Sequence, residues 1–138
     1  MKSSKIVIGL ILLGAMSIGF QGCVTGFRAA NSGVTTKPNF LIGNLVPRTT
    51  FSTEDVICFY VSVTWANVNQ EPGWQEVAWN WYKEGKLVGH RENDRAYFKG
   101  APNTRHVMQP ASALGTGHFK VECLINGDQI AAAEFDIK

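Results

Sequence analysis

The stretch EDVICFYVSVTW, residues 54–65, alternates two kinds of side chain along its length. Its odd-numbered positions are large and apolar: Ile57, Phe59, Val61, Val63 and Trp65. Its even-numbered positions are smaller or carry a polar group: Cys58, Tyr60, Ser62 and Thr64. Because successive side chains of a strand point to opposite faces, the pattern predicts a β-strand that buries its odd-numbered face.

The stretch WQEVAWNWYK, residues 74–83, repeats this alternation, with Val77, Trp79 and Trp81 on the face expected to be buried. Further strands are expected at 39–46, 87–90, 95–99, 105–109, 117–125 and 128–138. No stretch of about twelve residues has the helical period. Seven to eight short strands without a helical crossover predict an all-β fold, an antiparallel β-sandwich.

The final hairpin poses a question of register. Asn126-Gly127 is a strong two-residue turn signal. A plain two-residue loop would put Glu134 on the core face and leave Phe135 and Ile137 outside it. We therefore expect a one-residue shift, from a longer loop or from a bulge in the last strand, which returns Phe135 and Ile137 to the core.

The order of landmark residues resembles an immunoglobulin-like or fibronectin-like module. Cys58 lies on an early strand, Trp79 or Trp81 on the next, and Cys123 on the penultimate one. The sequence is also similar to small bacterial β-sandwich domains of unknown function, at 77–86, 95–98, 117–121 and 135–137. That resemblance implies no catalytic residues, because none is established in those domains.

The N-terminus carries a targeting signal. Lys2 and Lys5 precede an uncharged run at residues 6–20, which is short for a membrane span. The run ends in Phe20-Gln21-Gly22-Cys23, which resembles the signal of a bacterial lipoprotein. The resemblance implies lipid on Cys23 and a cell-envelope location, anchored in the outer membrane and facing the periplasm. An ordinary signal-peptidase cut near residues 29–30 is the alternative.

These features divide the chain into a signal peptide at 1–22, a lipidated cysteine and flexible tether at 23–38, and one domain at 39–138. Without the signal, the chain has eleven Lys and Arg against eleven Asp and Glu, so its net charge is near zero. A neutral domain lacks the basic field that binds phosphate backbones, so we expect no nucleic-acid partner.

The remaining cysteines are Cys58 and Cys123. An exported protein meets oxidising conditions, which favour a bridge between them. However, Cys58 shares its face with Tyr60, Ser62 and Thr64, and would reach the core only if the strand inverted its facing. We predict that no disulfide forms and that Cys123 is a buried free thiol.

No residue pattern indicates catalysis, a metal site or a cofactor. The three histidines, His90, His106 and His118, fall on different expected strands without metal-ligand spacing. We expect a non-enzymatic module that binds a protein partner in the envelope. The alternative is a glycan-binding module. Trp74, in a loop, and Tyr82, on the outward face, are the expected contact residues.

Overall fold

The computed structural model describes residues 26–43 and 45–138. The predicted signal peptide and Cys23 lie outside these residues. The elements, in chain order, are β1 (Arg28–Thr36), α2 (Lys37–Leu41), β2 (Thr50–Phe51), β3 (Val56–Thr64), β4 (Gly73–Lys83), β5 (Lys86–Phe98), β6 (Asn103–Pro110), α3 (Ala111–Leu114), β7 (Gly117–Ile125) and β8 (Asp128–Ile137).

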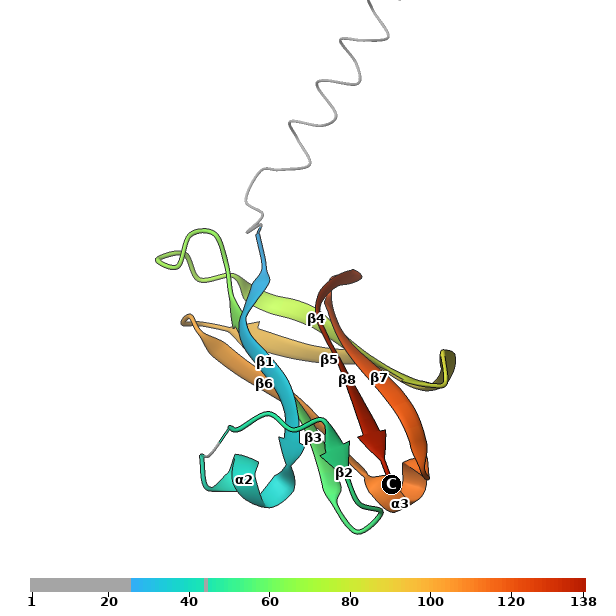
Figure 1. Ribbon diagram of the computed structural model, residues 1–138. Coiled ribbons are helices and arrows are strands. Elements are labelled where there is room, and N and C mark those ends of the chain that lie inside the picture. Colours follow the sequence, from blue (N-terminus) through green and yellow to red (C-terminus); the bar gives the residue numbers. More distant parts are fainter. Residues whose placement is uncertain (1–25, 44) are drawn as a thin grey trace, which may run out of the picture.

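The strands form two sheets that pack against each other (Figure 1). One sheet has the order β1-β3-β6, and the other has the order β2-β8-β7-β4-β5. Every pairing is antiparallel except that of β2 with β8. The predicted all-β antiparallel sandwich is therefore confirmed.

The core lies between the sheets and contains the residues that the alternation selects. The odd-numbered side chains of β3, together with Trp65 after it, are fully buried. Val77, Trp79 and Trp81 of β4 face them from the other sheet. Phe59 meets Trp79 edge to face, with ring centroids 5.7 Å apart, so the two predicted strands form the centre of the core.

The last hairpin has the register shift expected from the sequence. Asn126 and Gly127 both have positive φ, as a two-residue hairpin turn of this hand requires. A bulge follows in β8, because Leu124 pairs with Gln129 whereas Cys123 pairs with Ala131. Phe119 then lies opposite Phe135, and the two rings stack 5.4 Å apart in the core.

Three expected segments differ from the structure. Residues 28–36, predicted to be part of a tether, form strand β1 along β3. Residues 39–46, predicted to be a strand, begin in the short helix α2, and residues 42–43 and 45–46 lie in neither a helix nor a strand. The strands expected at 87–90 and 95–99 are parts of one strand, β5.

The segment after β1 covers the outer face of the three-stranded sheet. The hydroxyl of Tyr60 donates to the carbonyl oxygen of Leu45 at 3.1 Å, and the Phe40 ring lies 4.4 Å from that of His106. Cys58 and Tyr60 are therefore fully buried although they point away from the core between the sheets. Both faces of β3 are covered.

Candidate functional site

An exposed cluster of aromatic and cationic side chains lies on the outer face of the five-stranded sheet, at its β4–β5 edge. Trp74 is 59% exposed and Tyr97 is 43% exposed, although both are large rings. The two residues are directly opposite each other in the β4–β5 pairing, and their rings meet edge to face at 5.3 Å. The guanidinium of Arg95 lies 5.4 Å from the centre of the Trp74 ring. We call Trp74, Arg95 and Tyr97 the Trp74 surface.

Acidic groups border the Trp74 surface. The hydroxyl of Tyr97 donates to the carboxylate of Glu71, which precedes β4. This hydrogen bond raises the pKa of Tyr97 above its ordinary value. Glu76 lies opposite Arg95 in the sheet. Tyr97 is therefore held by Glu71, and Trp74 contacts both Tyr97 and Arg95.

The two contact residues expected from the sequence do not lie together. Trp74 and Tyr82 are eight residues apart on one strand, which is about 26 Å at 3.3 Å per residue. Tyr82 is half-buried, and the ammonium group of Lys120 lies 5.1 Å from its ring centre. Trp74, predicted to lie in a loop, is on strand β4 and belongs to the exposed cluster, whereas Tyr82 does not.

Tyr97 was not among the contact residues predicted from the sequence. The alternation in RAYFK places Tyr97 opposite in facing to Phe98, which is fully buried, so an outward Tyr97 was readable from the sequence. Its contact with Trp74 depends on the register between β4 and β5. That register shifts between Val77 and Trp79 and again between Trp81 and Tyr82. No local sequence pattern predicts these two shifts.

A cleft lies between strands β5 and β6. β5 and β6 are edge strands of different sheets, joined by a short turn at residues 99–102 (Figure 1). The cleft has a volume of about 290 Å³. Its walls come from β4, β5 and β6, and include Trp79, Arg95, Ala96, Thr104, Arg105 and His106. We call it the β5–β6 cleft.

The groups around the β5–β6 cleft are mainly hydrogen-bond donors. Arg105 donates from Nη2 to the carbonyl oxygen of Tyr97 at 3.0 Å, and its guanidinium lies 5.2 Å from the Phe98 ring centre. Its Nε is buried without a hydrogen-bond partner, as is the indole Nε1 of Trp79. Burial, and secondarily the charge of Arg105, lowers the pKa of His106. The cleft therefore favours negative charge.

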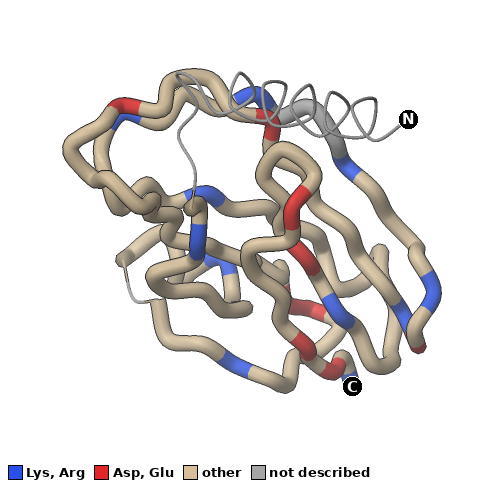
Figure 2. Tube along the Cα trace, turned by 90° about the horizontal axis from the view of Figure 1, so that it is seen from above, with Lys and Arg blue, Asp and Glu red and all other residues tan. Residues whose placement is uncertain are grey.

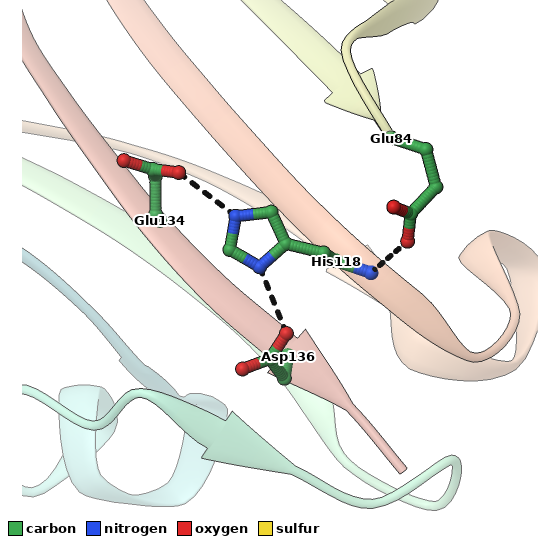
Figure 3. Close-up of polar contacts among 4 residues, drawn as sticks. All are labelled: Glu84, His118, Glu134 and Asp136. Carbon is green, nitrogen blue, oxygen red and sulfur yellow. Dashed lines mark hydrogen bonds and ion pairs between the residues drawn. The ribbon is translucent and has the colours of Figure 1, made fainter.

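A separate polar cluster lies on the outer face of β7 and β8, centred on His118 (Figure 3). Its Nε2 lies 2.8 Å from Glu134 Oε1, and its Nδ1 lies 2.8 Å from Asp136 Oδ1. Glu84 accepts a hydrogen bond from the backbone N–H of His118 at 2.7 Å. An imidazole donates from both nitrogens only when it is protonated. The hydrogen bonds to Glu134 and then Asp136 accordingly raise the pKa of His118.

The cluster belongs to an acidic part of the surface. Figure 2 shows Asp and Glu gathered along the part of the trace that leads to the C-terminus, whereas Lys and Arg are spread more widely. Within residues 26–43 and 45–138, no group of three or more His, Cys, Asp or Glu side chains is arranged to hold a metal ion. Glu134 and Asp136 are ion-pair partners of His118 when its imidazole is protonated.

Cys58 and Cys123 are both free and buried. Burial raises the pKa of Cys58 to about 11 and that of Cys123 to about 12. Only the thiolate is a strong nucleophile, so neither side chain is suited to nucleophilic chemistry near neutral pH. Cys123 packs in the core between the sheets, while Cys58 lies on the other side of β3.

The two packed antiparallel sheets define an immunoglobulin-like β-sandwich. No protein-family model and no curated protein matches the sequence. The structure is similar to that of an immunoglobulin-like protein from Pseudomonas aeruginosa, with a TM-score of 0.53, 13% identity, and coverage of 85% of this chain and 100% of that one. This similarity establishes the fold alone.

A second similar structure belongs to a larger protein. An alkylpurine DNA glycosylase from Pseudomonas fluorescens, bound to DNA containing an abasic-site analogue, has a TM-score of 0.55 and 14% identity. The match covers 83% of this chain but 31% of the glycosylase.

In the part of the chain that the structure describes, no helix is long and apolar enough to cross a membrane.

Proposed function

We propose that this chain is a non-catalytic lipoprotein of the bacterial envelope, whose sandwich binds a protein partner through the Trp74 surface. The exposed pair of Trp74 and Tyr97, with Arg95 against it, carries the proposal. Trp, Tyr and Arg are the residue types enriched at the energetic centres of protein interfaces. The lipid on Cys23 would hold this surface at the membrane on the periplasmic side.

The neighbours of the Trp74 surface favour a contact role. Aromatic rings lose few rotatable bonds on binding, and here the ring contact and the Arg95 guanidinium already restrict Trp74. The near-zero net charge of the mature chain removes the general attraction to phosphate backbones, so nucleic acid is not the proposed partner.

Affinity capture from detergent-solubilised membranes tests the proposal. The wild-type chain should capture a partner, and Trp74→Ala and Tyr97→Ala should each capture at least about tenfold less of it. Such a loss is expected for residues at the centre of an interface. Leu87→Ala is the matched control, because Leu87 is exposed on β5 outside the Trp74 surface. Equal capture by all four proteins would refute the assignment of this surface.

Glycan binding is the second candidate, favoured by the carboxylate of Glu71 beside the exposed rings. Sugar sites combine an aromatic face with acidic or amide groups that accept hydroxyl hydrogens. Titration of the protein with soluble peptidoglycan fragments, followed by tryptophan fluorescence, separates the two candidates. A saturable change that Trp74→Ala abolishes would favour the glycan, and no change would leave the protein partner as the proposal.

A further inference from the structure

We propose that the β5–β6 cleft binds the carboxylate of an aspartate or glutamate side chain from the protein partner. This inference rests on the proposed function, because it assigns the chemistry of the partner segment that meets the Trp74 surface. It depends on one arrangement: Trp79 and Arg105, which each have a buried N–H group without a hydrogen-bond partner, both line one cleft, and Arg95 of the Trp74 surface lines it too.

The first donor is the indole N–H of Trp79. Trp79 is 1% exposed, and its Nε1 has no hydrogen-bond partner. A buried donor without a partner costs about 1–3 kcal/mol, so most such groups in folded proteins are paired. The Nε1 of Trp81 is also without a partner, but Trp81 does not line the cleft. The unpaired N–H of Trp79 is significant because Arg105, a cationic residue with an unpaired N–H of its own, lines the same cleft.

That second donor is Arg105. On β6 it has the same facing as Val107, which is buried in the core, so its side chain enters the space between the sheets. Inward charges on edge strands also prevent unwanted pairing with other strands. That role requires only the charge, and it does not explain why Nε is buried unpaired in a residue that lines the same cleft as Trp79. A carboxylate has two oxygens and accepts from both.

The size and position of the cleft indicate that the bound carboxylate belongs to a single side chain of the partner. A volume of about 290 Å³ is at the lower limit for sites that enclose a whole small molecule, and it suits a single side chain. Arg95 lines the cleft and also lies over Trp74, and Arg105 donates to the carbonyl oxygen of Tyr97. A partner segment on the Trp74 surface is therefore adjacent to the cleft.

Propionate is the probe, because it reproduces the end of a glutamate side chain, and propionamide is its neutral counterpart. The indole N–H signals of the four tryptophans are followed by NMR during titration, with Trp79 identified by its loss in Trp79→Phe. Propionate should shift the Trp79 signal saturably, with a Kd on the order of millimolar for so small a group, and propionamide should not. The Trp81 signal should stay in place.

Variants of the donors complete the test. Arg105→Met, which keeps apolar contact with Phe98, should weaken propionate binding about tenfold or more, and Trp79→Phe should weaken it severalfold. Trp81→Phe is the matched control, since it removes an equally buried and unpaired indole N–H outside the cleft. If Arg105→Met does not fold, Arg105→Lys, which keeps the charge but loses Nε, serves in its place.

The inference would be overturned by an unmoved Trp79 signal, by an equal response to propionamide, or by unchanged binding in Arg105→Met. Stronger binding of inorganic phosphate than of propionate would also overturn it, because the site would then be a general anion site. The titration uses no partner protein. Its failure therefore leaves the capture experiment on Trp74 and Tyr97 intact, and the two proposals are separable.

Discussion

Replacement of the two core tryptophans of β4 tests the facing of that strand and hence the whole arrangement of sheets. Trp79 and Trp81 are 1% and 2% exposed, and each meets a phenylalanine edge to face, Phe59 at 5.7 Å and Phe135 at 6.3 Å. Truncation of a buried tryptophan to alanine costs about 3–5 kcal/mol through lost burial and the cavity that remains. A domain of this size has about 5–15 kcal/mol of stability in all.

Urea unfolding followed by far-ultraviolet circular dichroism measures the effect without relying on tryptophan fluorescence. With a slope of about 1–3 kcal/mol per molar urea, Trp79→Ala and Trp81→Ala should each lower the midpoint by at least about 1 M. Trp74→Ala is the control on the same strand. It loses only surface contacts with Tyr97 and Arg95, worth about 1 kcal/mol. A larger fall for Trp74→Ala than for Trp79→Ala and Trp81→Ala would show that β4 faces the other way. Equal midpoints for all three variants would also refute the reasoning.

Three further predictions concern single side chains. Labelled palmitate should enter the wild-type protein but not Cys23→Ser, and equal labelling of both would disprove lipidation at that residue. Alkylation of the unreduced, denatured protein should label both Cys58 and Cys123, whereas a chain without either label would contain a disulfide. The raised pKa of His118 means that its ion pairs stabilise the fold fully below pH 6.5, and that this contribution disappears as the pH rises through the folded-state pKa. An NMR titration should therefore place the His118 midpoint above 6.5. The difference in stability between wild type and His118→Gln should become smaller as the pH rises. A midpoint at or below 6.5 would contradict the geometry of Figure 3.

The sequence predicts the core strands well because their alternation records burial directly. β3 and β4 bury one face against each other, so their apolar residues recur at every second position. The bulge in β8 was also predictable, since without it Phe135 and Ile137 would leave the core. In these elements, the hydrophobic pattern and the tertiary structure contain the same information.

Strand β1 was missed because its stability comes from its neighbour. RAANSGVTT has no alternation, and only Gly33, Val34, Thr35 and Thr36 are buried. Its pairing with β3 supplies the hydrogen bonds that hold it extended. Strand propensity depends strongly on such context, which a single segment does not reveal.

Helix α2 was misassigned for a related reason. A short apolar run does not distinguish a strand from a buried helical turn. Pro38 at the start of α2 suits the first turn of a helix, where its missing N–H costs nothing. Phe40 then covers His106, while Leu41 and Ile42 remain exposed.

Only one residue of the pair in the Trp74 surface was predicted from the sequence. Trp74 was identified, but its contact with Tyr97 depends on the register between two strands.

The parallel pairing of β2 with β8 affects how the chain folds. It joins Phe51 to Ile137, and β8 also separates β2 from β7 in the five-stranded sheet. Contacts between segments so distant in sequence raise the contact order, which slows folding because a long loop must close before the contact forms. The sheet is incomplete until β8 has been synthesised. A nascent chain therefore cannot complete this sheet before its last strand is made, which is compatible with export of an unfolded chain to the proposed envelope location.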